Sequence, residues 1–284
     1  MDTTLDLEYN DDQSAIIAGI ENFCTENTVQ DHARHPERQF PRELWRMLAQ
    51  LGVFAPGAPI MAGEGGGIVE ICAICEALGR HVFPGPIQAT YLAMQLLDDE
   101  EAFAVMMGDS MVCLSHRGDT VLPWGTEADI FLVCGARGIT RALPPTYVPP
   151  VKVMGDETWG RNKLQVAEAM QNSARGLAVA HIATAAYLGA AAMRLISIAS
   201  EHAAVRRQFD RPLAEFQAVS HPLADCVVWT TAAQTLTRTA ACSIDLVGFN
   251  KEGRKMVECQ AAGAAVSARR AALKSAFTCH QVLG

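Results

Sequence analysis

The chain has 284 residues, half of them hydrophobic, and carries a formal net charge of −8 at pH 7. This length and hydrophobic content allow one large domain or two smaller ones with a substantial core, while the acidic balance excludes a dedicated nucleic-acid-binding protein. We find no run of about 18 uncharged apolar residues flanked as a membrane span is, and no basic, apolar start, so a cytoplasmic protein without membrane association is expected.

The first part of the chain, residues 1–109, is predicted to be a helical domain. Asp11 or Asp12 is suited to cap a first helix. Residues 41–52 begin with Pro and end with Gly, the usual asymmetry of a helix. Further helices are expected around Cys72 and after Pro86. The glycine-rich run at residues 63–67 lacks the Lys-Ser/Thr of a phosphate-binding loop, and no predicted strand precedes it, so it is interpreted as a turn.

The nine cysteines are scattered, and only Cys72 and Cys75 lie close together. An odd number of cysteines in a chain of this size indicates reduced thiols rather than a disulfide framework. Cys72 and Cys75 have the spacing of a redox or metal pair, but they lie in an apolar helical pattern and no second ligand pair follows. Core packing is therefore favoured for both, and no metal is expected.

Residues 110–168 have a different character from the rest of the chain. Apolar runs at residues 111–115 and 130–134 have the length of strands, and several prolines exclude longer elements. From residue 169 to 284 the chain is Ala-rich and again helical, as expected of a buried bundle, with helices predicted at about residues 178–205, 216–249 and 255–281. The predicted fold is mainly α with a small β region. It comprises an N-terminal α-bundle, a reduced middle β segment and a C-terminal α-bundle.

The most informative motif joins the first two helices of the C-terminal bundle. Arg206 and Phe209 form an R-x-x-F pattern, which is followed by Pro212 and then by Phe216-Gln217. A guanidinium at such a corner offers two-point hydrogen bonds to phosphate oxygens. A simpler interpretation also stands for each residue: Arg206 is solvated at a helix end, Phe209 packs under the corner, and Gln217 caps the next helix.

This run closely resembles the signature of acyl-CoA dehydrogenases, which bind the diphosphate and adenosine half of FAD with it across a subunit interface. The order of α-bundle, β region and α-bundle is similar to that fold, as are residues 42–53, 76–80 and 124–133. Gln281 and Gly284 resemble the start of the family's Q-x-x-G-G-x-G motif. The resemblance implies FAD as cofactor, with binding residues Arg206, Phe209, Gln217, Gln281 and Gly284.

The sequence departs from the family pattern where catalysis would take place. The β region is about half the expected size and lacks the T-E-x-x-G-S-D run that contacts the flavin and the acyl-CoA. Asp210 replaces the glycine that usually follows the phenylalanine. The family's glutamate base lies either after Q-x-x-G-G-x-G, beyond residue 284, or near Ala180 and His181, where no carboxylate stands.

General-base catalysis contributes about 10²–10⁴-fold, and removing a proton from carbon requires it. His181, Glu157 and Glu168 are the candidates for an unusual base. A core histidine on an Ala-rich helix and two solvated carboxylates explain them more simply. We therefore assign no catalytic residue to this chain.

These features resemble the degenerate β subunit of bacterial α2β2 acyl-CoA dehydrogenases of steroid and cholesterol catabolism. The resemblance implies a catalytic α subunit as partner, which would bind most of the acyl-CoA and carry out α,β-dehydrogenation of the thioester. This chain would complete the partner's FAD site and be inactive alone. Two alternatives remain open: a purely structural partner that binds no flavin, and a complete homomeric enzyme with an unusual base.

Overall fold

The computed structural model describes residues 7–27, 40–56, 67–153, 157–250 and 252–284. The chain forms two compact units, each assembled from separate stretches. Unit 1 comprises Met1–Glu21, Cys72–Val82 and His181–Gly284, and unit 2 comprises Asn22–Ile71 and Phe83–Ala180. The division at residues 109 and 168 that the sequence predicts stays a prediction. Most of the glycine-rich run, residues 63–66, lies outside the described residues.

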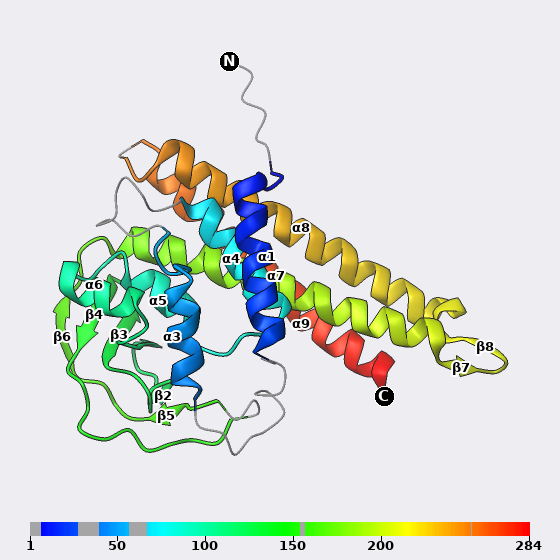
Figure 1. Ribbon diagram of the computed structural model, residues 1–284, viewed down its shortest axis with the longest axis horizontal. Coiled ribbons are helices and arrows are strands. Elements are labelled where there is room, and N and C mark those ends of the chain that lie inside the picture. Colours follow the sequence, from blue (N-terminus) through cyan, green and yellow to red (C-terminus); the bar gives the residue numbers. More distant parts are fainter. Residues whose placement is uncertain (1–6, 28–39, 57–66, 154–156, 251) are drawn as a thin grey trace. The chain divides into compact units, whose positions relative to one another are not determined.

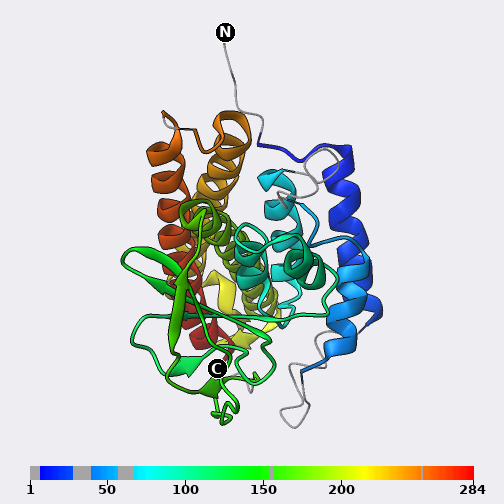
Figure 2. The same ribbon diagram turned by 90° about the vertical axis from the view of Figure 1, so that its left-hand side faces the viewer.

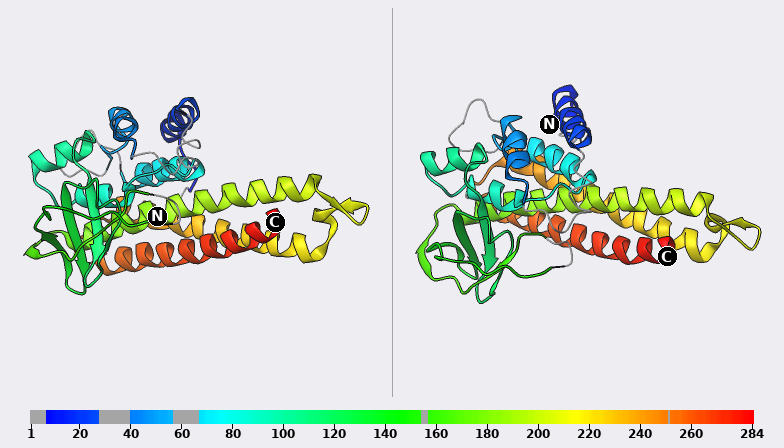
Figure 3. Two further views of the ribbon diagram at one scale, coloured as in Figure 1. Left: turned by 90° about the horizontal axis from the view of Figure 1, so that it is seen from below. Right: turned by 60° about the horizontal axis from the view of Figure 1, so that its bottom comes forward.

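Three long helices dominate unit 1. Their bounds are α7 (Ser173–Val205), α8 (Gln217–Val247) and α9 (Arg254–Leu283). Figures 1 and 3 show α8 and α9 running side by side in opposite directions. Buried alanines such as Ala233, Ala240 and Ala264 line these helices, and small side chains allow close approach of the backbones. The three helical runs predicted in this region are confirmed.

The apolar character of α7 corrects one expectation from the sequence. α7 is long and apolar enough to cross a membrane by length and composition, which we did not expect of any segment. Half of its most apolar stretch is buried inside the protein, and the core helix of a soluble protein passes the same test. The hydrophobicity of α7 is therefore weak evidence for a membrane span.

Two further helices, like α7, contain residues of both units. α1 spans Asp11–Glu26 and α4 spans Ile68–Arg80. The N-terminus of α1 differs from prediction, because Asn10 and not an aspartate caps it. The Asn10 side chain accepts from the Gln13 backbone N–H at 2.8 Å, and the Gln13 side chain accepts from the Asn10 N–H at 3.1 Å. This reciprocal pair is a capping box, which satisfies two otherwise free donors.

The helices of unit 2 surround an aromatic cluster. They are α3 (Arg42–Gln50), α5 (Ile87–Ala93) and α6 (Asp99–Met106). Trp45 of α3 is 1% exposed, and its ring lies 4.7 Å from that of Phe54 between centroids. Tyr91 of α5 packs edge-on against Phe54 and donates its hydroxyl to the Val53 carbonyl at 2.5 Å. The buried hydroxyl is therefore satisfied.

A four-stranded sheet forms the rest of unit 2, with strand order β1-β3-β4-β6. The strands are β1 (Val112–His116), β3 (Ile130–Gly135), β4 (Gly138–Ala142) and β6 (Val166–Ala169). β1 pairs with β3 in parallel, and the other pairs are antiparallel. The sequence predicted β1 and β3 but not β4 or β6.

The sheet is covered on both faces because its side chains alternate. Ile130 and Leu132 pack against α5 and α6, which lie over one face (Figure 2). Phe131 and Val133 point to the other face and pack with Leu122 and neighbouring loop residues. A further small sheet joins β2 (Val121–Leu122) to β5 (Gly160–Arg161).

Candidate functional site

The connection between α7 and α8 is a two-stranded hairpin. β7 (Arg207–Gln208) pairs with β8 (Arg211–Pro212), and a short 3-10 helix, η1 (Leu213–Glu215), leads into α8. The two turn residues, Phe209 and Asp210, have φ angles of +52° and +63°. Two consecutive left-handed residues form a type I′ turn, which Asn-Gly usually occupies. The glycine that Asp210 replaces would therefore suit this backbone better.

Phe209 stands at the tip of the hairpin and is 87% exposed. Its ring approaches that of Phe216 edge-on, with 6.3 Å between centroids. The Arg211 guanidinium lies 3.9 Å from the centroid of the same Phe216 ring. Phe216 is thus the residue that packs under the corner, and Phe209 projects to solvent. Figure 3 shows the hairpin extending beyond the end of α9.

Of the three arginines in this segment, Arg206 is the one whose side chain has no contact partner among the described residues. Arg207 donates to the Asp210 carbonyl at 2.5 Å, and Arg211 stacks on Phe216. The exposed side chain of Arg206 makes no hydrogen bond or ion pair within the part of the chain that the structure describes. Its backbone is fixed, because its N–H donates to His202 and its carbonyl accepts from Leu213. A positioned but unpaired guanidinium is available to an anionic ligand.

The other predicted ligands lie at the same end of the bundle. Gln217 is the first residue of α8, and Gln281 and Gly284 stand at the end of α9; all three are exposed. Val282 and Leu283 pack against a buried cluster that also receives Leu213 and Val219, so the end of α9 meets the start of α8. The fold brings the five predicted residues to one end of unit 1, where all five are exposed.

The position expected for a base contains no carboxylate. Ala180 is buried and His181 is partly buried on α7. Burial, and then the charge of Arg269, lowers the pKa of His181 below its ordinary value. A neutral histidine with this environment fits the interpretation as a core residue.

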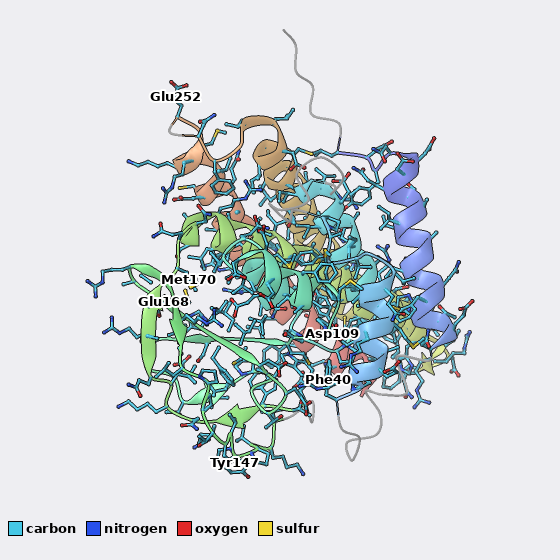
Figure 4. The ribbon with its side chains drawn as sticks, turned by 60° about the vertical axis from the view of Figure 1, so that its left-hand side comes forward. Phe40, Asp109, Tyr147, Glu168, Met170 and Glu252 are labelled. Atoms are coloured by element: carbon cyan, nitrogen blue, oxygen red, sulfur yellow. The ribbon has the colours of Figure 1, made fainter. Side chains whose placement is uncertain are left out.

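The two candidate carboxylates also lack the setting of a base. Glu168 lies exposed on the outer strand β6, opposite Arg141 in the register of the sheet. Figure 4 shows it close to Met170 at the edge of the sheet. Glu157 is partly exposed in the loop before β5. No group of three or more metal-ligating side chains occurs among the described residues.

Sequence reasoning missed a buried ionic cluster in unit 1. Glu76 of α4 is 1% exposed, and its two carboxylate oxygens accept from Nε and Nη2 of Arg238 at 3.0 and 2.7 Å. The Tyr9 ring lies 4.4 Å from the same guanidinium. The sequence feature that could have revealed this cluster is Glu76 within an apolar helical run. Such a run is expected to be buried, and a buried charge requires a partner. Nearby, a Cβ at Gly79 would overlap the backbone of Tyr187, so glycine allows α4 and α7 to approach closely.

Unit 1 also exposes an apolar face on α8 and α9. Val228 and Trp229 are 67% and 56% exposed, and Leu273 and Phe277 are 61% and 69% exposed. Lys274 lies 5.8 Å from the Trp229 ring centroid and makes a salt bridge of 3.6 Å with Asp225. Large apolar side chains exposed on two adjacent helices are typical of an interaction surface. We call these four residues the α8–α9 apolar face.

Models of known protein families match both the N-terminal and the C-terminal part of the chain. Residues 10–98 match the model described as acyl-CoA dehydrogenase, N-terminal domain, and residues 170–284 match the acyl-CoA dehydrogenase C-terminal domain. Among curated proteins, the chain is 28% identical over 212 residues to acyl-CoA dehydrogenase IpdE2 of Mycobacterium tuberculosis. That match covers 72% of this chain and 66% of the relative, so the chain spans just under two thirds of it.

Solved structures confirm the fold. The ChsE4–ChsE5 complex from Mycobacterium tuberculosis matches with a TM-score of 0.76 at 20% identity, covering 99% of this chain and 88% of that one. A variant of the Tcur3481–Tcur3483 steroid ACAD matches with a TM-score of 0.74 at 22% identity, covering 96% and 87%. At these identities the likeness establishes the architecture, which agrees with the mainly helical fold and small middle sheet that the sequence predicts.

Proposed function

Because this chain belongs to the acyl-CoA dehydrogenase family, we propose that it is the subunit of a heteromeric enzyme that completes the FAD site of a catalytic partner. The family uses FAD, which when bound supplies the oxidant for α,β-dehydrogenation of a CoA thioester. Arg206 carries the proposal. Its backbone is fixed by hydrogen bonds, and its exposed guanidinium makes no contact within the described residues, at the base of a hairpin that projects away from its own bundle.

The geometry of the hairpin fits the diphosphate of FAD. Arg206 offers two parallel N–H donors, which match phosphate oxygens better than a lysine would. Gln217 and Gln281 add neutral amides at the same end of unit 1, and the backbone near Gly284 is accessible. Phe209 offers an exposed ring for contact with an aromatic group of the cofactor. Because all five residues are exposed in this chain, a second chain would close the site from the other side.

The chemistry would then belong to the partner. Ala180 and His181 stand at one of the two positions where the family carries its carboxylate, and burial together with the charge of Arg269 lowers the pKa of His181, which favours the neutral imidazole. Glu168 lies at the edge of the sheet opposite Arg141. Because no carboxylate stands at the α7 position, we infer that the partner supplies the carboxylate and binds most of the acyl-CoA.

The partner would dock on unit 1. Burial of the α8–α9 apolar face would favour docking, because each fully buried side chain of this size contributes about 1.5–3 kcal/mol. Two structural neighbours are complexes of paired chains, ChsE4–ChsE5 and Tcur3481–Tcur3483. We infer an α2β2 assembly with a full-length acyl-CoA dehydrogenase. We also infer a steroid-derived acyl-CoA as substrate, because the second neighbour is described as a steroid ACAD.

The test is a comparison of the chain alone with the chain co-expressed with a glutamate-bearing acyl-CoA dehydrogenase of its own organism. We expect the pair to co-purify with flavin absorbance and to oxidise acyl-CoA esters with ferricenium as acceptor. The chain alone should show no turnover. Robust turnover by the purified chain without a partner would establish the homomeric alternative and overturn the proposal.

The purely structural alternative also has one observation in its favour. Asp210 places a carboxylate at the tip of the hairpin, where it would repel a diphosphate. This alternative predicts that the flavin content of the complex does not depend on Arg206. The Arg206 substitutions described below therefore separate the two functions.

A further inference from the structure

Phe216 is the residue against which the hairpin between α7 and α8 packs. It is the N-cap residue of α8, and its carbonyl accepts from the Val219 N–H at 2.8 Å and from the Ser220 N–H at 2.9 Å. Its half-buried ring contacts the hairpin twice, through the edge-on Phe209 ring and through the stacked Arg211 guanidinium. One side chain anchored at the start of a long helix therefore holds both sides of the turn.

The hairpin needs such support because its own strands are short. β7 and β8 contain two residues each, and an isolated two-stranded hairpin is only marginally stable in water. Both turn residues, Phe209 and Asp210, adopt left-handed conformations that are unfavourable for residues with a Cβ. Such conformations persist only where the surrounding structure imposes them. The Phe216 ring and the hydrogen bond from Arg207 to the Asp210 carbonyl supply that constraint.

The base of the hairpin connects this constraint to Arg206. The Leu213 N–H donates to the Arg206 carbonyl at 2.8 Å, and the Phe216 N–H donates to the Leu213 carbonyl at 3.1 Å. These two bonds link the backbone of Arg206 to that of Phe216. Because Arg211 stacks on the ring and Arg207 is bound to a carbonyl, Arg206 is the arginine whose guanidinium the hairpin presents.

We propose that Phe216 is a positioning residue, which holds the hairpin so that Arg206 meets the diphosphate of FAD. This role rests on the proposed function, because it takes the diphosphate as the ligand of Arg206. Phe216 acts through Arg206 rather than as a ligand of the cofactor. A hairpin that is already held in its binding conformation loses little conformational freedom on binding, which raises the affinity. Loss of the ring should therefore weaken FAD binding only while Arg206 is present.

The experiment measures the FAD affinity of the co-expressed complex, titrated after removal of bound flavin and followed by flavin fluorescence. Phe216→Leu, which keeps an apolar side chain and loses the ring, should lower the affinity about three- to tenfold. Phe216→Tyr keeps the ring and should stay within about twofold of the parent. In the Arg206→Ala background, Phe216→Leu should change the affinity by less than about twofold, because the residue through which it acts is absent. Phe103→Leu, at an exposed phenylalanine of unit 2, is the matched control and should have no effect.

Hydrogen exchange of the same complex without FAD gives a second readout, which does not depend on the cofactor. The Leu213 amide reports on the base of the hairpin, because it donates to the Arg206 carbonyl. Phe216→Leu should accelerate its exchange about threefold or more, and Phe216→Tyr should not.

The outcomes distinguish a positioning role of Phe216 from the proposed function of Arg206. A loss of affinity confined to the parent background, with faster exchange at Leu213, supports the positioning role. An equal loss in the Arg206→Ala background, or unchanged exchange at Leu213, refutes it. If Arg206→Ala lowers the affinity and Phe216→Leu does not, the positioning role is refuted and the proposed function stands. If Arg206→Ala leaves the affinity unchanged, both are refuted.

Discussion

The Glu76 carboxylate is bound at two points by the Arg238 guanidinium, yet the two partners differ in their exposure. The Glu76 side chain is 1% exposed, whereas that of Arg238 is 30% exposed. Removal of the arginine leaves a charge in the interior, and removal of the glutamate leaves a charge that water can reach. The two halves of one ion pair should therefore have unequal effects on stability.

Substitution of each partner by methionine tests this asymmetry. Arg238→Met should lower the free energy of unfolding by about 3–5 kcal/mol, because it orphans a buried carboxylate, and Glu76→Met should cost clearly less. The double variant should recover most of the loss, since two packed apolar side chains replace the pair. Urea unfolding followed by circular dichroism measures all three.

As control, Glu258→Ala breaks the exposed ion pair with Arg254, and it should lower the free energy of unfolding by about 0.5 kcal/mol or less. Equal losses for the two single variants would contradict the argument.

Asp210→Gly should stabilise the hairpin. Asp210 has φ +63°, and a non-glycine residue tolerates that conformation at a cost that glycine avoids. We expect the thermal midpoint to rise, with a gain of about 0.5–1 kcal/mol. Asp210→Ala, which removes the carboxylate and keeps the Cβ, should be neutral or destabilising, and this control separates the backbone effect from the charge. A higher flavin content in both variants would show that the carboxylate weakens diphosphate binding.

Arg206→Ala should lower the FAD occupancy of the complex much more than its stability. Loss of a charge-assisted phosphate contact costs about 1.5–3 kcal/mol, roughly ten- to a hundredfold in affinity. Arg206→Lys should recover only part of it, because an ammonium cannot form the two-point contact. Arg207→Ala is the matched control, since that side chain is already bound to the Asp210 carbonyl. Flavin absorbance after dialysis at low FAD measures occupancy, and an unchanged value in Arg206→Ala favours the purely structural function.

Double substitution of Trp229 and Phe277 by serine should weaken the assembly with the partner. Both side chains are more than half exposed, so the fold of the chain itself loses little. Buried aromatic residues dominate the energetics of interfaces, and each truncation there typically costs about 2 kcal/mol or more. Analytical ultracentrifugation of the co-expressed pair measures the change. Phe103→Ser, at an exposed phenylalanine of unit 2, is the control. An intact complex in the double variant would place the partner elsewhere.

Much of the helical fold could be predicted because its signals are local. The predicted helices in residues 178–205, 216–249 and 255–281 agree with α7, α8 and α9, since long apolar periodicity and terminal glycines mark them. Strand β6 was missed because its partner, β4, is distant in the sequence. Strand β4 follows β3 directly in a hairpin, but only Ile139 and Ala142 of its five residues are buried, so it lacks the apolar run that marked β3. Val166 and Glu168 of β6 are both exposed, so that strand shows no alternation to detect.

The candidate site, like the fold, could be predicted from the sequence only in part. The hairpin residues were found because they stand together in a motif, and the structure adds what the motif cannot give, namely that Phe216 rather than Phe209 packs beneath the corner. Their binding of FAD stays a prediction. The Glu76–Arg238 pair was missed because its two residues are 162 positions apart. Only the burial of Glu76 in an apolar helix indicated that a cation had to lie opposite.

His181 gives two linked predictions, because it is the titratable group nearest the expected base position. Burial, with the charge of Arg269, lowers its pKa below the ordinary 6.5. Between pH 6.5 and that lower value the unfolded chain binds more protons than the folded chain, so stability falls as the pH falls through this window. Burial lowers the pKa of His81 as well, which adds a second contribution of the same sign. His181→Gln should flatten the decline in thermal midpoint as the pH falls below about 6.5.

The same variant separates a core histidine from a base. His181→Gln keeps a polar side chain of similar size, so the assembled enzyme should retain its turnover, at a cost of about 1–2 kcal/mol in stability. A true general base would lose about 10²–10⁴-fold in rate. Turnover with ferricenium, compared at equal flavin content, decides between them. A hundredfold loss with assembly intact would make His181 catalytic, and the chain would then be an active subunit with a histidine in place of the carboxylate.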